Sequence, residues 1–232
     1  MRRRAVRAIP SAVPSKGVLY LFDIDGTLLD AHGSGRAAFD AVMHAQHGVA
    51  DASRGMRYGG KTDPALIDEI FIARLGRPAS ESERAAFLDA YLPHLRARLA
   101  AGGVRVLDGA VEALGYLKPR TRLGIATGNV RAGAEAKLAA AGLDGWFEVG
   151  GYGCDSAVRG ELVARAIERA GVPASEVVVV GDTTHDIAAA RACGAVVCAV
   201  ATGSDPAERL GHADGVLASL RELPAWHAAQ FA

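Results

Sequence analysis

Two aspartates stand two residues apart in the segment Asp23-Ile24-Asp25-Gly26, at the end of an apolar run. Two carboxylates in one turn can divide a reaction between them, because one can attack as a nucleophile while the other donates or accepts a proton. A turn that merely ends a strand also uses Asp and Gly. Taken alone, the segment therefore leaves a catalytic and a purely structural interpretation open.

A second acidic pair, Asp182 and Asp186, follows another apolar run. If both runs are parallel strands, these carboxylates gather with Asp23 at one edge of the sheet and repel one another unless a cation lies among them. Mg²⁺ prefers such oxygen ligands. Asp186 could instead stabilise the start of a helix, where acids are favourable, whereas Asp182 has no such structural explanation.

The third piece is Thr127-Gly128-Asn129, which also follows an apolar run. A hydroxyl and backbone N–H groups at a strand end can hold phosphoryl oxygens. A bound phosphoryl group also needs a fixed positive charge, and Arg159 is the best-placed candidate because it lies between this segment and the second acidic pair. We expect the alternative, Lys137, to be a solvated residue on a helix surface.

The elements that position these residues alternate between strand and helix. Four continuous apolar runs are typical of strands buried on both faces of a parallel sheet: Val18–Asp23, Leu123–Thr127, Val177–Asp182 and Val196–Val200. Helical segments are expected at Ala110–Leu117 after an Asp108 N-cap, Arg131–Ala141, Glu161–Ala170 and Asp186–Cys193. The alternation predicts an α/β fold with a doubly wound, Rossmann-like parallel-sheet core.

One long stretch, residues 31–103, contains no buried-strand run and is helical in pattern throughout. A helix is expected with Asp63 as its N-cap and Pro64 in its first turn. Another begins with the capping box Ser80-x-x-Glu83 and is expected to kink or end at Pro93. The sequence therefore predicts an inserted all-helical cap at 31–103, joined through glycine-rich hinges to a core formed by residues 18–30 and 104–232.

Composition excludes several classes of protein. Of the 232 residues, 50% are apolar and 22% charged, and 26 basic residues balance 26 acidic ones, which argues against disorder and against general nucleic-acid binding. Three cysteines without zinc spacing exclude a disulfide scaffold. No apolar stretch is long enough for a membrane span. We expect a soluble cytoplasmic protein, with residues 1–17 a disordered leader; a transit peptide is the alternative.

The ordered motifs Asp23-x-Asp25-Gly26-Thr27-Leu28, Thr127 and Gly181-Asp182-Thr183-x-x-Asp186, with a basic residue at 159, resemble those of the haloacid dehalogenase superfamily. The helical stretch after the first motif is similar to the small cap of its phosphoglycolate phosphatase-like and β-phosphoglucomutase-like members. The resemblance implies an Asp23 nucleophile, an Asp25 acid–base and Mg²⁺ held by Asp23, the Asp25 carbonyl, Asp182 and Asp186. Thr127 and Arg159 would hold the phosphoryl group, although the superfamily usually has lysine in the position of Arg159.

The resemblance favours a Mg²⁺-dependent phosphatase that hydrolyses a small phosphorylated metabolite through an aspartyl-phosphate, acting as a monomer or homodimer. Gly128 and Asn129 are expected to bind the phosphoryl group, and Lys61 and Arg57 of the cap to contact the rest of the substrate. Asp25 argues against dehalogenation, which needs no acid there. A β-phosphoglucomutase-like phosphosugar mutase keeps every core motif and stays open, as does a non-catalytic binding protein on the same fold.

Overall fold

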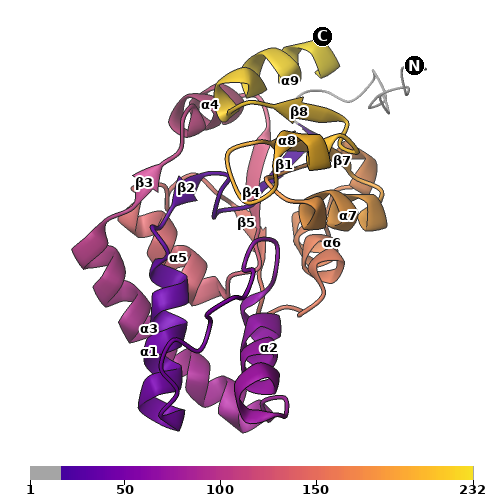
Figure 1. The fold of residues 1–232 in the computed structure, drawn as a ribbon. Helices are drawn as coiled ribbons and strands as arrows, with labels where there is room; N and C mark the ends of the chain where they lie inside the picture. Colours follow the sequence, from indigo (N-terminus) through magenta and orange to yellow (C-terminus); the bar gives the residue numbers. More distant parts are fainter. Residues whose placement is uncertain (1–16, 232) are drawn as a thin grey trace.

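A parallel six-stranded sheet forms the centre of the computed structural model, which describes residues 17–231. The strand order is β5-β4-β1-β6-β7-β8, and every neighbouring pair is parallel (Figure 1). The strands are β1 (Leu19–Phe22), β4 (Arg122–Ala126), β5 (Val149–Gly151), β6 (Val177–Gly181), β7 (Val196–Val200) and β8 (Gly215–Leu217). This confirms the doubly wound α/β fold. The chain turns from one half of the sheet to the other beside β1.

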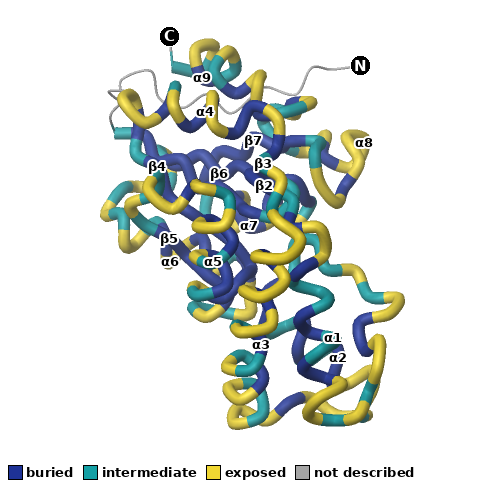
Figure 2. The backbone as a smooth tube through the Cα atoms, turned by 90° about the vertical axis from the view of Figure 1, so that its left-hand side faces the viewer, coloured by how far each residue is buried: buried dark blue, intermediate teal, exposed yellow. Residues whose placement is uncertain are grey.

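Helices cover both faces of this sheet. One face packs against α4 (Ala110–Leu117), α5 (Arg131–Ala140) and α9 (Leu223–Phe231), the other against α6 (Arg159–Ala170) and α7 (Thr184–Cys193). A hydrophobic core lies on each face of the sheet, and alternate residues of β1 point into one or the other. Tyr20 and Phe22 lie in the core beneath α4, α5 and α9, and Leu19 and Leu21 lie in the core beneath α6 and α7. The strands appear almost uniformly buried in Figure 2, which explains why their sequences are continuous apolar runs rather than alternating ones.

Three helices fill the stretch between the first strand and the rest of the sheet: α1 (Ser34–His47), α2 (Asp63–Leu75) and α3 (Glu81–Gly102). They lie together below the sheet in Figure 1, around an aromatic cluster in which the Phe39 ring is 5.1 Å from that of Phe87 and 4.8 Å from that of Tyr91. Two short antiparallel strands, β2 (Leu29–Asp30) and β3 (Arg105–Val106), pair where the chain enters and leaves this helical part. The remaining helix, α8, spans Ala207–Leu210, and 3₁₀ turns span Ala174–Glu176 and Leu220–Glu222.

Several expected helix boundaries are wrong. Thr62, not Asp63, is the N-cap of α2, because its hydroxyl accepts a hydrogen bond from the Ala65 N–H. Gly109 in a left-handed conformation, not Asp108, precedes α4. Asp63 is thereby free to bond outside its own helix, which bears on the site described below.

Pro93 neither ends nor interrupts α3, which continues to Gly102. A proline removes one backbone donor and costs stability inside a helix. Beyond Pro93, however, Leu95 and Leu99 remain on the buried face of α3. Their burial outweighs the lost hydrogen bond, so the helix persists.

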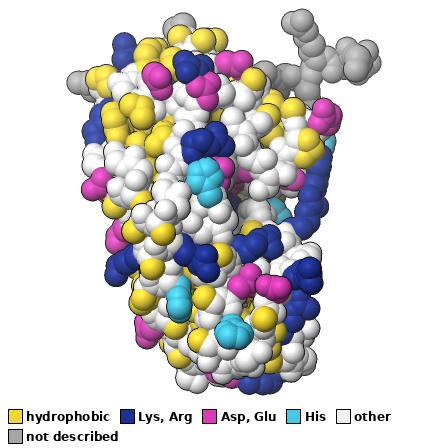
Figure 3. All heavy atoms as spheres, turned by 60° about the vertical axis from the view of Figure 1, so that its left-hand side comes forward, with side chains coloured by type: hydrophobic (Ala, Val, Ile, Leu, Met, Phe, Trp, Pro, Cys, Tyr) yellow, Lys and Arg dark blue, Asp and Glu magenta, His cyan; other side chains and the backbone are white. Residues whose placement is uncertain are grey.

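The outer surface carries mixed charge on the face drawn in Figure 3, where basic and acidic side chains alternate with hydrophobic ones. Within residues 17–231, no helix has the length and apolar character that a membrane span requires. The expected leader at 1–17 lies outside the described residues apart from Gly17.

Candidate active site

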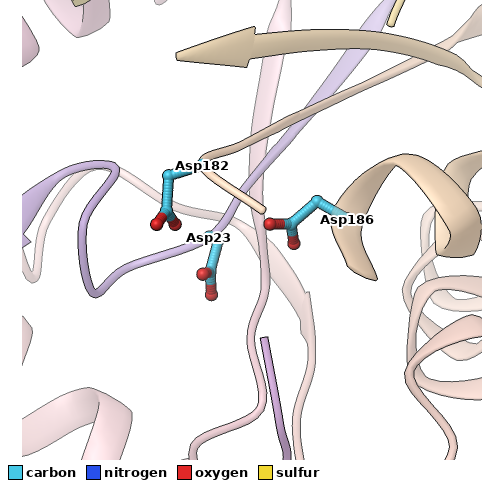
Figure 4. Close-up of side chains that lie close together, drawn as sticks. All are labelled: Asp23, Asp182 and Asp186. Atoms are coloured by element: carbon cyan, nitrogen blue, oxygen red, sulfur yellow. The ribbon is translucent and has the colours of Figure 1, made fainter. Parts of the chain in front are cut away.

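Three buried aspartates converge where β1 and β6 end, at the point where the strand order reverses (Figure 4). Asp23 follows β1, Asp182 follows β6, and Asp186 lies in the first turn of α7. Each offers a carboxylate oxygen, and these oxygens lie within 4.8 Å of one another. Adjacent parallel strands bring their carboxyl ends to one edge, so residues 159 positions apart in sequence meet there.

Gly26 allows the turn after β1 to approach Asp182 closely. Its φ of 82° lies in the left-handed region, and a Cβ placed there would come within 2.6 Å of Asp182 Oδ2. The Asp182 carboxylate is fixed by two donors, the Ser204 N–H at 2.6 Å and the Thr27 hydroxyl at 3.3 Å. Any larger residue at 26 would displace this carboxylate.

Asp186 has both of the roles considered from sequence. Its Oδ2 accepts hydrogen bonds from the Thr183 N–H at 3.0 Å and the Thr183 hydroxyl at 2.7 Å, completing a capping box at the start of α7. Its Oδ1 accepts from Arg159 Nε at 2.9 Å and Nη2 at 2.6 Å. The cap thus holds the carboxylate where it can face the other two.

Arg159 lies beside the expected nucleophile, with Nη2 3.0 Å from Asp23 Oδ1. It is the first residue of α6, and only 8% of its side chain is exposed. Burial would lower the pKa of this guanidinium, but the Asp186 and Asp23 carboxylates outweigh burial and raise it. Arg159 is therefore a permanent cation inside the acidic cluster.

Ionising the carboxylates of this cluster costs free energy, because they are buried close to one another. Burial raises the pKa of Asp23 to about 6, with Arg159 opposing the shift. Burial, followed by repulsion from Asp186 and Asp23, raises the pKa of Asp182 to about 8. If all three carboxylates are ionised, they and the one guanidinium carry a net charge of minus two, and the raised pKa values of Asp23 and Asp182 indicate that this charge is unfavourable without a further cation. A divalent cation with a preference for oxygen ligands would balance that charge, so this donor set fits Mg²⁺.

Thr127, Gly128 and Asn129 lie at the end of β4, facing this cluster. The buried Thr127 Oγ1 accepts a hydrogen bond from Asn129 Nδ2 at 2.9 Å, which leaves its own proton for another acceptor. Gly128 permits contact with the helical part, because a Cβ there would lie 2.1 Å from the Lys61 carbonyl oxygen. Asn129 Nδ2 also donates to Asp25 Oδ2 at 2.8 Å, linking the first and third motifs.

Lys137 is buried at this site, so its expected position on a solvated surface is wrong. Its Nζ donates to Asp25 Oδ2 at 2.6 Å and to Asn129 Oδ1 at 2.7 Å, and only 5% of the residue is exposed. The sequence does contain a signal for this burial. Lys137 shares a helix face with Ala134 and Leu138 at helical spacing, and that face of α5 is buried.

A family model for haloacid dehalogenase-like hydrolases matches residues 19–194, a range that includes the three motifs and Arg159. The chain belongs to the haloacid dehalogenase-like hydrolase family. The parallel six-stranded sheet is thus the fold of a family member.

Curated relatives of this haloacid dehalogenase-like hydrolase extend over most of the chain. A probable phosphatase, IndB, of Dickeya dadantii is 30% identical and covers 84% of this chain and 86% of its own. A plasmid-encoded phosphoglycolate phosphatase of Cupriavidus necator is 33% identical, covering 88% and 90%. In fold, the chain is similar to CbbY from Rhodobacter sphaeroides in complex with phosphate, with a TM-score of 0.72, 23% identity and coverage of 88% and 95%.

The two expected cap residues of this hydrolase lie in different places. Lys61 lines a cavity of about 410 Å³ together with Asp23 and Asp25, and its ammonium group pairs with Glu69. Arg57 lines an adjoining groove of about 780 Å³ instead, which shares Lys61 with the cavity and also contains Glu69. The structure therefore brings Lys61, but not Arg57, to the cavity that contains the aspartates.

Two further residues lining this cavity were missed by sequence reasoning, Asp63 and Tyr91. The backbone N–H of Asp63 donates to the Gly128 carbonyl at 2.8 Å, and its carboxylate accepts from the Val130 N–H at 2.8 Å. Burial raises the pKa of Asp63 to about 6, while Lys137 opposes the shift. No local pattern marks such a residue, because its partners lie more than 60 positions away.

Proposed function

We propose that this haloacid dehalogenase-like hydrolase is a Mg²⁺-dependent phosphatase that hydrolyses a small phosphomonoester through an aspartyl-phosphate. The observation that carries the proposal is the contact between buried Arg159 and Asp23, 3.0 Å apart, within a cluster of three carboxylates. A cation beside a nucleophilic carboxylate suits a substrate that brings its own negative charge. The phosphatase names of the curated relatives support the same activity.

Four groups would hold the metal: the carboxylates of Asp23, Asp182 and Asp186 and the backbone carbonyl of Asp25. When bound, Mg²⁺ supplies positive charge that lets an anionic substrate approach an anionic nucleophile and that offsets charge in the transition state. The excess negative charge of the cluster supports this assignment.

In the first step, an Asp23 carboxylate oxygen attacks phosphorus and the bond between phosphorus and the ester oxygen breaks. Asp25 transfers a proton to that leaving oxygen, so an alcohol departs. In the second step, Asp25 takes a proton from water, whose oxygen attacks the phosphorus. Inorganic phosphate leaves and the Asp23 carboxylate is restored.

Thr127 and Arg159 would hold the phosphoryl oxygens through both steps, with Gly128 and Asn129 bordering them. The Thr127 oxygen already accepts from Asn129, which favours donation of its own proton to the substrate. The Arg159 guanidinium is anchored by Asp186 and keeps its charge at every relevant pH. Arginine would therefore take the place of the family's usual lysine.

The substrate is a small phosphorylated metabolite, because the cavity of about 410 Å³ must hold both the phosphoryl group and its leaving group. We propose residues 18–30 and 104–232 as the catalytic core and 31–103 as a cap whose closure excludes bulk water. We propose Lys61 as the cap residue that contacts substrate, since it lines the cavity that contains Asp23 and Asp25. The cytoplasmic location, the contribution of Arg57 and a monomeric or dimeric state stay predictions.

The test is phosphate release from p-nitrophenyl phosphate and a panel of metabolite phosphomonoesters, with Mg²⁺ or EDTA. We expect turnover that requires Mg²⁺ and falls at least about a thousandfold in Asp23→Asn, since the nucleophile is lost. Asp144→Asn, an exposed aspartate away from the cavity, is the matched control. Metal-independent turnover, or full activity of Asp23→Asn, would contradict the mechanism.

Two other results would identify the remaining functions. A long-lived phospho-enzyme detected by intact mass, with turnover of a sugar bisphosphate into its isomer and no phosphate release, would indicate a mutase. Absence of both phosphate release and phospho-enzyme would indicate a binding protein on this fold.

A further inference from the structure

A groove of about 780 Å³ adjoins the catalytic cavity, between the helical part and the core. One wall comes from α1, α2 and the loop that joins them, and the other from the start of α7 and the segment that follows β7. Its volume lies in the range of about 300 to 1,000 Å³ that is typical of small-molecule sites. The groove thus has the size of a ligand site, and no step of the proposed reaction takes place in it.

Basic side chains dominate this groove. It is here called the basic groove and is defined by six Lys and Arg side chains: Arg36, Arg54, Arg57, Lys61, Arg74 and Arg209. Its two carboxylates, Glu69 and Asp205, pair with Lys61 and Arg209. The other four cations form no ion pair with any described carboxylate. With six cations against two carboxylates, the basic groove carries an excess of four positive charges.

Two of the unpaired arginines are held in place by neutral groups. The Arg36 guanidinium donates to the carbonyl oxygen of Ser53 at 2.9 Å and to that of Met56 at 2.8 Å. The Arg74 guanidinium donates to two carbonyl oxygens of the same loop, at 2.7 Å and 2.9 Å. Carbonyl oxygens fix these side chains without cancelling their charge. The cations are therefore ordered before a ligand binds, which lowers the entropy lost on binding.

The basic groove lies outside a close contact between the helical part and the core. Gly59 packs on Ser204, and Gly60 on His185, so tightly that a Cβ on either glycine would lie 2.5 Å from a side-chain atom. Gly59 and Ser204 line both spaces, whereas Gly60 lines only the cavity and His185 only the groove. The contact therefore separates the two spaces, and a ligand in the groove lies outside the catalytic cavity.

Cations lie on both sides of that contact. Arg54 and Arg57 belong to the loop before α2, whereas Arg209 belongs to α8 of the core. Burial would raise the pKa of Asp205 in the core, but hydrogen bonds from Thr184 and the charges of two arginines, one of them Arg57, together lower it. The charge of Arg57 therefore acts across the groove. A ligand that joins the two sides must carry several negative charges along its length.

We propose that the basic groove binds a chain of phosphoryl groups, as in inorganic triphosphate or a nucleoside triphosphate, and that the bound chain joins the helical part to the core. Five of the six cations are arginine, whose planar guanidinium binds phosphoryl oxygens through paired hydrogen bonds. A phosphoryl chain spreads several negative charges over its length and so matches cations on two walls. A single carboxylate or orthophosphate is too short and carries too little charge to do so.

The bound chain is expected to slow turnover. If substrate enters and product leaves when the cap separates from the core, a ligand that joins the two parts opposes that separation. Because it binds outside the cavity, it should lower kcat on p-nitrophenyl phosphate, and excess substrate should not relieve the inhibition. This effect on turnover rests on the proposed function, whereas binding of the chain does not.

The experiment measures binding of inorganic triphosphate, ATP and orthophosphate to the whole protein by calorimetry without Mg²⁺. We expect triphosphate to bind at least about a hundredfold more tightly than orthophosphate, because several charged hydrogen bonds are at stake. Equal affinities for triphosphate and ATP would identify the phosphoryl chain alone as the ligand, and a higher affinity for ATP would identify a nucleotide. Inhibition is then measured at constant free Mg²⁺, because phosphoryl chains also bind that ion.

Variants on each wall locate the binding. The double variant Arg54→Gln/Arg57→Gln removes two exposed cations of the helical part whose side chains bond to no described residue, so folding should be preserved. Arg209→Gln removes a cation of the core. Each is expected to raise the Kd of triphosphate about tenfold or more. The double variant Arg96→Gln/Arg98→Gln makes the same charge change on exposed residues of α3 outside the groove, and should leave the Kd unchanged.

The outcomes separate the basic groove from the phosphatase activity. Equal affinity for triphosphate and orthophosphate, or a control variant that weakens binding as much as Arg54→Gln/Arg57→Gln, overturns the site. Weaker binding in that variant but not in Arg209→Gln overturns the joining of the two parts. Inhibition that excess substrate relieves and that both groove variants retain means that the chain enters the catalytic cavity, which also overturns the proposal. If no ester is hydrolysed but the variants weaken binding as expected, the proposed function fails and the basic groove stands.

Discussion

The catalytic cavity has two ends that are built in opposite ways. At the phosphoryl end, Asp23 and Asp182 directly follow the adjacent strands β1 and β6. Arg159 forms ion pairs there with Asp23 and Asp186. At the end that faces the helical part, the lining residues Gly35, Tyr91 and Lys137 come from the helices α1, α3 and α5. One end is built from buried carboxylates around a guanidinium, whereas the other is built from side chains carried by packed helices.

This difference separates two tasks of a phosphatase. The rigid sheet edge fixes the groups that must contact the phosphoryl group of any phosphomonoester. Burying several carboxylates there costs free energy, which a bound metal ion would offset. Under the proposed function, the helical end would meet the leaving group, which is the part of the substrate that differs between metabolites. It can change through single side chains on helices without disturbing the sheet, which is why we place reaction at one end and selectivity at the other.

Apart from loss of the nucleophile in Asp23→Asn, the largest effect is expected at the phosphoryl end, from Arg159→Met. This change removes the cation that bonds to Asp23 and Asp186. The value of kcat/KM should fall about a hundredfold to a thousandfold on every ester, because the negative charge of the phosphoryl group in the transition state loses a charged hydrogen-bond donor. Arg159→Lys keeps the charge and should retain more activity than the Met variant. Steady-state kinetics on ethyl phosphate measures both; equal activity of wild type and Arg159→Met would remove Arg159 from the reaction.

The two ends also differ in how far sequence could predict them. Each expected motif residue at the phosphoryl end directly follows an apolar strand or begins the next helix, so local pattern and the topology of parallel strands were sufficient to bring Asp23, Asp182 and Asp186 together. Short edge strands such as β5 and β8, three residues each, carry too little pattern to be foreseen.

The helical end could not be assembled in that way. The neighbours of Tyr91 and Gly35 are set by how α1 and α3 pack, and a buried aromatic at helical spacing is indistinguishable in sequence from ordinary core. Lys137 is the exception, because its place on the buried face of α5 could have been recognised. In this helix the spacing of the apolar residues, rather than the charge of the lysine, determines which face Lys137 occupies.

Asp63 tests whether the contact between the helical part and the core is sensitive to pH. Its pKa is raised by burial from 3.8 to about 6, so between these values the folded protein holds a proton that the unfolded chain releases. The stability contribution of Asp63 is therefore highest at low pH and is lost as the pH rises through about 6. Lys137 and Asp25 are the charged groups that act on it.

Asp63→Asn retains an acceptor for the Val130 N–H and cannot ionise. Relative to the wild type, its free energy of unfolding should rise between pH 4 and pH 7 by up to about 3 kcal/mol, the equivalent of two pKa units. Urea unfolding at several pH values measures the difference, with Asp144→Asn as control. A difference that does not vary with pH would mean that Asp63 is not buried as an ionisable group.

Asp182→Asn tests how much the buried acidic cluster lowers the free energy of unfolding. Burial and the neighbouring acids Asp186 and Asp23 raise the pKa of Asp182, so its neutral replacement should increase the free energy of unfolding by about 2 kcal/mol in EDTA at pH 7. In saturating Mg²⁺ the order should reverse, because the wild type gains a ligand that the variant binds weakly. Urea unfolding with and without Mg²⁺ measures both; the same order in both conditions would contradict a metal site here.

The smallest effect is expected from Lys137→Met, the counterpart of Arg159→Met at the other end. Asp25 loses the ammonium group but keeps the Asn129 amide at 2.8 Å, so kcat on ethyl phosphate should fall only about tenfold. Lys118→Met, at an exposed lysine of the core, is the matched control. If Lys137→Met were as damaging as Arg159→Met on ethyl phosphate, Lys137 would belong to the phosphoryl end, and the division of the cavity into a reacting and a selective end would fail.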